Sequence, residues 1–242
     1  MKKSVIAVTA LMATTLCFSA QAAKYKEVAV SDGGSVTGKI SFTGKDPKPK
    51  TYAITKDNSV CGQGNREIDF VQVNNGGLTN AVVYLVKVKE GKSFPAKSGK
   101  LNQKGCEFLP FLSVMHNGDK IDAINEDPVL HNIHTYEQIG KAKKTAFNVS
   151  QPEPGTVTKP IKFKRGAAMK VECDAHDFMH AFVFVAKNPY YAVVDAEGNF
   201  KIDNIPAGKY KINAWHGTLG IKKGKVEIAA NGAASVDFSY KK

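Results

Sequence analysis

The 242-residue sequence has few cysteines, a single tryptophan and no motif of a familiar catalytic class. It lacks a C-x-x-C-H motif, which excludes covalent attachment of a c-type haem. It also lacks a phosphate-binding loop, a recognisable catalytic triad and a pair of carboxylates spaced for acid–base chemistry, so we do not expect an enzyme. After the N-terminal segment no apolar run is long enough to span a membrane, and we expect no integral membrane segment.

The chain also lacks a compact basic run with interleaved aromatic residues, although its formal net charge is +12. This absence argues against binding to nucleic acid. The lysines are instead dispersed through residues 24–50, 87–104, 141–170 and 201–225. A diffuse basic surface is usually only a solvated one, but it could also steer an acidic redox partner or hold the protein near anionic lipid or polysaccharide.

The first 22 residues have the features of a secretory signal peptide. Lys2 and Lys3 precede an apolar stretch over residues 5–18, and the small residues of 20–22 form a cleavage site. We therefore expect cleavage after Ala22 and a periplasmic or extracellular protein. Cys17 lies inside the apolar stretch and would be removed.

Three cysteines remain after cleavage, in an oxidising compartment. An odd number allows one disulfide and leaves one cysteine for another role. Cys61 and Cys106 are the natural pair, because Cys173 belongs to the metal-binding motif described below. Removal of Lys2 and Lys3 leaves 34 − 2 = 32 basic residues against 22 acidic ones, a net charge of +10.

The remaining sequence predicts an all-β protein. Short segments rich in Val, Ile, Phe, Tyr and Thr recur between Gly, Pro, Asn and Asp breaks, a spacing typical of β-sandwiches. The predicted strands are 35–42, 81–88, 113–115, 120–125, 168–173, 181–186, 199–202 and 209–215. Between the fourth and fifth of these we expect a polar connection containing Pro152 and Pro154.

The most specific motif is Cys173, His176 and Met179, a C-x2-H-x2-M pattern between two predicted strands. One short loop can then present a thiolate, an imidazole and a thioether to a single point. This donor set suits a trigonal copper site with two histidines, one cysteine and a weak axial methionine. Zinc is the alternative metal, since thiolate and imidazole also suit zinc, but the thioether favours copper.

A second histidine is needed from elsewhere, and the segment 125–134, N-E-D-P-V-L-H-N-I-H, supplies His131. Together the two segments resemble the cupredoxins, and among these most closely the amicyanins, over residues 99–188. The resemblance implies a Greek-key β-sandwich with one type 1 copper bound by His131, Cys173, His176 and Met179. It also implies that Asn132 braces the two ligand-bearing segments through hydrogen bonds.

Other histidines leave alternatives open. His134 lies three residues past His131, and on an extended strand it would point to the opposite face. It is the alternative ligand if the first assignment fails. A second metal site that uses His180 or His216 is a further alternative.

The flanking residues carry a different set of motifs, which resemble a carboxypeptidase-regulatory-like (prealbumin-like) β-sandwich. The four motifs, in order, are G-S-V-T-G at 34–38, A-V-V-Y-L at 81–85, D-A-E-G-N-F at 195–200 and P-A-G-K-Y at 206–210. The resemblance implies that the copper domain, 99–188, is inserted into a discontinuous sandwich of 24–98 and 189–242. One enlarged sandwich is the alternative.

These observations predict an exported copper protein that transfers single electrons between redox proteins, such as a c-type cytochrome or a periplasmic dehydrogenase. Copper storage or delivery is one alternative, although such carriers tend to be rich in methionine or histidine. A structural role is another, in which the flanking sandwich docks the copper domain on a larger surface complex.

Overall fold

A computed structural model describes residues 25–95 and 99–241 of the chain. Among these residues the only helix is the short α1 (Asn58–Cys61), and almost all other regular structure is strand, which confirms the all-β prediction. The predicted signal peptide, with Cys17, lies outside the described residues. No helix in the described part of the chain has the length and apolar character needed to cross a membrane.

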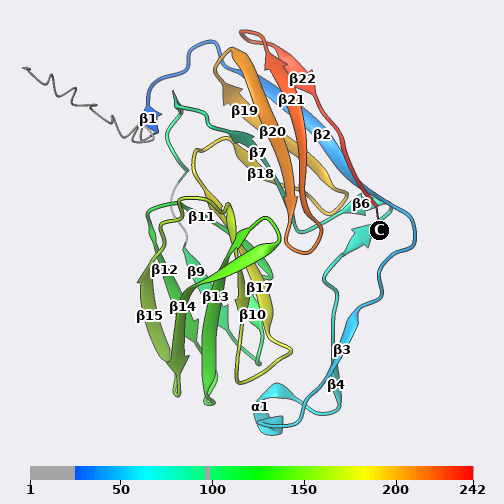
Figure 1. The fold of residues 1–242 in the computed structure, drawn as a ribbon, viewed down its shortest axis with the longest axis vertical. Coiled ribbons are helices and arrows are strands. Elements are labelled where there is room, and N and C mark those ends of the chain that lie inside the picture. The colour runs from blue at the N-terminus through cyan, green and yellow to red at the C-terminus, as the bar shows by residue number, and fades with distance from the viewer. Residues whose placement is uncertain (1–24, 96–98, 242) are drawn as a thin grey trace, which may run out of the picture.

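One β-sandwich is built from residues on both sides of the middle segment (Figure 1). Its core contains Ile40, Leu85, Ile202 and Ile212, contributed by both of its sheets. One sheet has the order β18 (Tyr191–Val193), β7 (Ala81–Val86), β20 (Gly208–His216) and β21 (Gly220–Ile228). The other has β19 (Asn199–Ile205), β2 (Gly34–Thr43), β6 (Gly77–Leu78) and β5 (Val73–Asn74), with β22 (Ala233–Ser235) and β23 (Phe238–Lys241) also paired to β2.

The middle segment forms a second β-sandwich, with Leu101, Ile121, Val171 and Val183 in its core. Its first sheet has the order β10 (Phe108–Leu109), β9 (Lys100–Gln103), β12 (Lys120–Asn125) and β15 (Gly155–Pro160). Its second sheet has β11 (Leu112–His116), β17 (His180–Ala186), β16 (Ala168–Glu172), β13 (His131–Ile139) and β14 (Ala142–Gln151). The C-x2-H-x2-M motif lies in this sandwich.

The predicted polar connection after His131 is wrong. Most of it is the long antiparallel hairpin of β13 and β14, followed by β15. β14 has exposed side chains along most of its length, including Lys143 and Lys144. Such a strand lacks the apolar alternation by which half-buried strands are recognised in a sequence.

The two sandwiches meet through an aromatic cluster. Phe182 and Phe184 of β17 pack against Trp215 of β20, with ring centroids 6.0 and 5.7 Å apart, and Val82 of β7 is buried beside them. Gly217 lies so close to Phe182 that an added Cβ atom would approach the ring to 2.7 Å. The contact is therefore closely packed and apolar.

Two smaller pairs of strands complete the fold. The parallel pair β1 (Lys26–Glu27) and β8 (Glu90–Gly91) lies beside the flanking sandwich. The antiparallel pair β3 (Lys50–Ala53) and β4 (Asn65–Ile68) carries α1 between its strands. Residues 50–68, here called the arm, extend away from β2 (Figure 1). The arm contributes Tyr52, Ile54 and Cys61 to the core cluster of the middle sandwich.

Candidate metal centre

The loop between β16 and β17, residues 173–179, contains Cys173, His176 and Met179 and is here called the ligand loop. The two strands are antiparallel neighbours, with Glu172 opposite His180, so the loop must close within seven residues. The backbone N–H of Met179 donates to the carbonyl of His176 at 3.0 Å. A ligand spacing of three residues therefore puts the sulfur and nitrogen donors on the same side of one tight turn.

The first residue of β13 is His131, and its side chain is fully buried. Successive side chains of a strand point to opposite faces, so His134, three residues later, lies on the other face of the sheet. There its Nδ1 atom is 3.0 Å from the Asp174 carboxylate and 2.9 Å from the Tyr136 hydroxyl. The structure thus places His131, and not His134, beside the donor atoms of Cys173 and His176.

Three donor atoms converge at the end of the middle sandwich. The Nδ1 atoms of His131 and His176 are 3.3 Å apart, and the Sγ atom of Cys173 is 3.7 Å from Nδ1 of His176. These three residues form a group whose donor atoms all lie within 4.8 Å of one another. Met179 is 1 % exposed and belongs to the same core cluster as Cys173.

Each of the two imidazoles contacts a carboxylate through Nε2, the ring nitrogen on the side away from the donor cluster. The Nε2 atom of His131 is 2.8 Å from Asp127, and the Nε2 atom of His176 is 2.9 Å from Asp57. An ionised carboxylate only accepts hydrogen bonds, so these partners assign the proton of each neutral ring to Nε2. Each Nδ1 atom then presents a lone pair to the other and to the sulfur, an arrangement that fits a bound cation.

The pKa shifts of His176 and Asp127 agree with this assignment of the protons. Burial lowers the pKa of His176, which favours the neutral, ligating form. Burial raises the pKa of Asp127, but hydrogen bonds from the Cys106 N–H group, His131 and the Gly105 N–H group lower it by more, and the net shift is downward. The carboxylate behind His131 is therefore held ionised.

The thiol of Cys173 is also fixed in place. Burial raises its pKa, which favours the protonated thiol in the metal-free protein, whereas a bound metal would favour the thiolate. The backbone N–H of Asn132 donates to Cys173 Sγ at 3.3 Å, and the side-chain oxygen of Asn132 accepts from the Asp174 N–H group at 3.3 Å. Asn132 therefore connects β13 to the ligand loop, in the bracing position that the sequence predicts.

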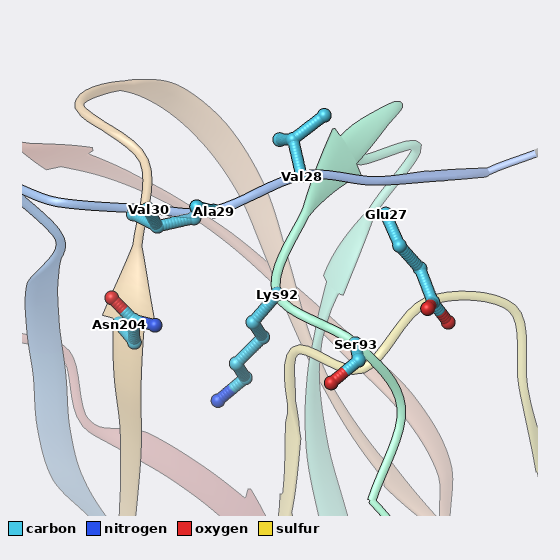
Figure 2. Close-up of a pocket in the computed structure, with 7 residues that line it drawn as sticks. All are labelled: Glu27, Val28, Ala29, Val30, Lys92, Ser93 and Asn204. Carbon is cyan, nitrogen blue, oxygen red and sulfur yellow. The ribbon is translucent and has the colours of Figure 1, made fainter.

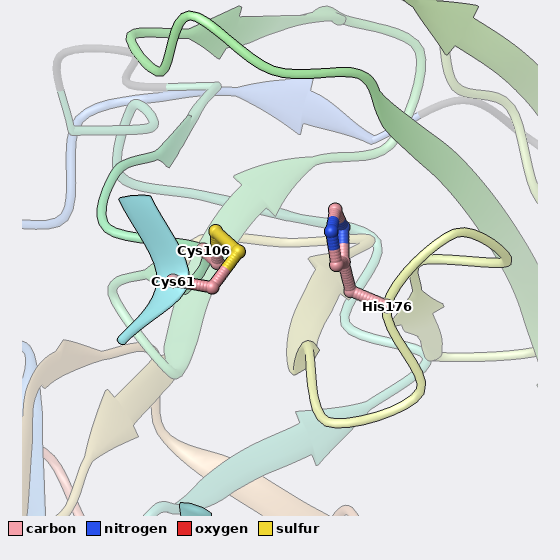
Figure 3. Close-up of side chains that lie close together, drawn as sticks. All are labelled: Cys61, Cys106 and His176. Atoms are coloured by element: carbon pink, nitrogen blue, oxygen red, sulfur yellow. A yellow bond between two sulfur atoms is a disulfide. The ribbon is translucent and has the colours of Figure 1, made fainter. Parts of the chain in front are cut away.

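The disulfide between Cys61 and Cys106 is present, which confirms the predicted pair. It lies beside His176, and the two sulfur atoms and a ring nitrogen of His176 lie within 4.8 Å of one another (Figure 3). Among the described residues, Cys173 is the only cysteine without a disulfide.

The other candidate histidines lie outside the donor cluster. His180 forms a 2.9 Å hydrogen bond through Nε2 to the Tyr52 hydroxyl, and burial lowers its pKa to about 4. His216 accepts backbone hydrogen bonds from Thr218 and Leu219 at Nδ1, and burial lowers its pKa to about 4. In the described ranges, neither histidine is part of a group that could hold a metal.

A surface depression of about 420 Å³ lies away from this cluster (Figure 2). It is formed where the N-terminal segment passes the loop after β8 and the end of β19. Lys92 lies in it and donates to the backbone carbonyl of Asp203 at 2.7 Å. The depression is of mixed character, lined by Glu27, Val28, Ala29, Val30, Lys92, Ser93 and Asn204.

The carboxylates were missed by reasoning from the sequence. Asp127 had a usable signal, because it lies four residues before His131 in the N-E-D-P segment. Asp57 had none of its own, since it is 119 residues from its partner His176. The predicted disulfide at Cys61, four residues further on, was the nearest indication that the arm reaches the ligand loop.

Comparison with known families gives one partial match in sequence. The profile of a family described as polysaccharide lyase family 4, domain II, matches residues 165–236. This span begins before β16 and runs through the ligand loop into the flanking sandwich. No curated protein sequence matches the chain. The predicted prealbumin-like resemblance is not confirmed by these matches.

Among solved structures the similar proteins include copper proteins. A purple cupredoxin from Nitrosopumilus maritimus aligns at 15% identity and a TM-score of 0.31, over 37% of this chain and 100% of that one. Amicyanin from Paracoccus versutus aligns at 16% identity and a TM-score of 0.31, over 39% of this chain and 86% of that one. A copper-containing nitrite reductase from Thermus scotoductus aligns at 16% identity and a TM-score of 0.28, over 42% of this chain and 24% of that one.

Proposed function

We propose that His131, Cys173, His176 and Met179 bind one copper ion and that the protein carries single electrons between exported redox proteins. The convergence of the two Nδ1 atoms and one Sγ atom, at 3.3 and 3.7 Å, is the observation that carries the proposal. The protein would act as an electron carrier and not as an enzyme. Copper, when bound, supplies a reversible one-electron change between Cu(II) and Cu(I).

The donor set favours copper over zinc. Thiolate and thioether are soft ligands that suit Cu(I), and imidazole suits copper in either state. A structural zinc site would favour cysteine or histidine, and not methionine, as its fourth ligand. Met179 is instead the fourth ligand candidate in the loop, buried next to the thiol.

The braces around the ligands suit electron transfer, because a carrier works best when its ligands move little between oxidation states. Asp127 fixes His131, Asp57 fixes His176, and Asn132 holds the thiol. Such outer hydrogen bonds fix the tautomer and orientation of ligating histidines.

The partners and the location follow from the sequence. A cleaved signal peptide over residues 1–22 would export the protein to the periplasm or beyond, where c-type cytochromes and periplasmic dehydrogenases are suitable partners. The excess of 32 basic over 22 acidic residues in the mature chain would favour a partner with an acidic surface. The flanking sandwich, with its prealbumin-like motifs, would dock the copper-binding sandwich on such a partner or complex.

Addition of Cu(II) to the purified metal-free protein is expected to produce an intense blue or purple colour. The cause is charge transfer from the Cys173 thiolate to the metal, and ascorbate should bleach the colour reversibly. Absorption and electron paramagnetic resonance spectra measure both effects, and Zn(II) is the matched colourless control. A colourless Cu(II) complex would reject the type 1 site.

His131→Ala is expected to lower the copper affinity strongly and to change the spectrum, whereas His134→Ala should leave both nearly unchanged. The reason is that only His131 directs its ring nitrogen to His176, while His134 contacts Asp174 and Tyr136 on the opposite face. Competition titration with a copper chelator measures the affinity. A strong loss of copper affinity in His134→Ala, with His131→Ala nearly unchanged, would identify His134 as the ligand.

Copper storage or delivery is the alternative function, and the burial of both imidazoles favours slow release of the metal. Stopped-flow mixing of the reduced protein with an oxidised c-type cytochrome distinguishes the two. Fast exchange supports a carrier, and slow exchange with every redox partner supports storage.

A further inference from the structure

The arm lies on the ligand loop, where it covers His176. Its residues Tyr52, Ile54 and Cys61 are buried in the core cluster that also contains Cys173 and Phe178 of the loop. Tyr52 contacts His180 directly after the loop. His176 as a whole is 1 % exposed, so the chain itself covers the imidazole.

Two independent connections lock the arm in place. The first is the disulfide from Cys61 to Cys106. The second is Arg66, whose guanidinium donates to the backbone carbonyls of Cys61 and Gly105 at 2.8 and 3.1 Å and also to that of Cys106. The same guanidinium lies 4.9 Å from the ring of Phe178. Arg66 therefore joins both halves of the disulfide to the ligand loop.

Asp57 is held by the turn that carries the disulfide. Its backbone carbonyl accepts hydrogen bonds from Val60 and Cys61 at 2.9 and 2.8 Å, and its φ of 52° is in the left-handed region. This conformation is uncommon for residues other than glycine, asparagine and aspartate. The turn is therefore built to hold the Asp57 carboxylate 2.9 Å from Nε2 of His176.

We propose that Asp57 is a positioning residue for the metal ligand His176, supplied by a disulfide-locked arm that closes the imidazole edge of the metal site. The inference rests on the proposed copper site. The carboxylate orients the ring so that Nδ1 faces the metal, and its negative charge stabilises Cu(II) relative to Cu(I). A partner protein would have to take the electron by a path other than direct contact with His176.

Two substitutions separate the charge of Asp57 from its hydrogen bond. Asp57→Asn keeps the size, an acceptor and a tolerance for positive φ, but it removes the charge. The Cu(II)/Cu(I) equilibrium should shift about tenfold toward Cu(I), which for a one-electron couple is a rise of about 59 mV in the reduction potential. Asp57→Gly keeps the backbone conformation and removes the side chain, and should lower copper affinity by about 10- to 100-fold.

Glu67→Gln is the matched control, because it removes one negative charge from an exposed position in β4 of the same arm. It should leave the potential and the affinity unchanged. Voltammetry measures the potential, and chelator competition measures the affinity. If both Asp57 variants behave like Glu67→Gln in a blue wild-type background, Asp57 does not position the ligand.

A measurement on the metal-free protein separates this inference from the proposed function. Long-range ¹⁵N–¹H NMR spectra of the histidines report which ring nitrogen carries the proton. We expect the Nε2–H form of His176 in the wild type and in Glu67→Gln, and a mixture of tautomers in Asp57→Gly. A colourless wild type with this NMR pattern would reject only the copper function, whereas identical NMR patterns in all variants would reject the role of Asp57.

Discussion

Cys173→Ala is expected to abolish the visible colour of the copper-loaded protein. The intense absorption of a type 1 site needs a thiolate bound to copper, and in the described chain Cys173 is the only cysteine outside a disulfide. Its Sγ atom lies 3.7 Å from Nδ1 of His176, and the nearby sulfurs of Cys61 and Cys106 are joined in a disulfide and cannot supply a thiolate in its place. The two imidazoles that remain would bind Cu(II) weakly and without strong colour.

The matched control for Cys173→Ala is Asp177→Asn, in an exposed position of the same loop. This variant should keep the colour, because the loop backbone and all four donors are unchanged. Absorption spectra at equal copper loading, with denaturation curves to verify folding, measure the effect. A Cys173→Ala protein that stays blue would mean that the metal lies elsewhere.

The double substitution Cys61→Ser and Cys106→Ser is expected to lower the free energy of unfolding by about 4 kcal/mol. The estimate follows from the chain entropy that a crosslink with a sequence separation of 45 removes from the unfolded state. Changing both cysteines avoids an unpaired thiol beside His176. Urea denaturation of the metal-free protein measures the loss.

The same double variant tests whether the disulfide fixes the position of the arm. If the fold survives, copper affinity should fall toward that of Asp57→Gly, because a loosened turn no longer fixes the carboxylate. Arg66→Lys is the companion variant, since lysine keeps the charge but cannot donate to three carbonyls in the fork geometry of arginine. Unchanged stability and unchanged copper affinity in the double variant would show that the arm needs no crosslink.

Three of the four candidate ligands could be recognised in the sequence because they lie in one short segment. The C-x2-H-x2-M loop lies within seven residues. The choice of His131 came from the resemblance to the cupredoxins, and the alternation of side chains along a strand then placed His134 on the opposite face. The strand 120–125 was predicted with the bounds of β12, because Ile121, Ala123 and Ile124 follow directly on the turn at 117–119. These features depend on residues that are close together in the chain.

Two of the parts that were not predicted, β14 and the contact of Asp57, depend on exposed or distant residues. β14 was missed because its lysines face solvent, and no apolar pattern marks it. The contact of Asp57 with His176 joins residues 119 positions apart, in an arm that the disulfide links to Cys106. A carboxylate in a polar stretch gives no sign of such a contact.

β17 has a mechanical consequence for the whole molecule. The strand is buried on both faces, with Val183 and Val185 in the middle core and Phe182 and Phe184 in the contact with Trp215. It also follows Met179 without a break. A tilt of the flanking sandwich would therefore displace β17 and, with it, Met179 at the end of the ligand loop. A partner bound to the flanking sandwich would in this way act on the position of Met179 without contacting the candidate metal centre.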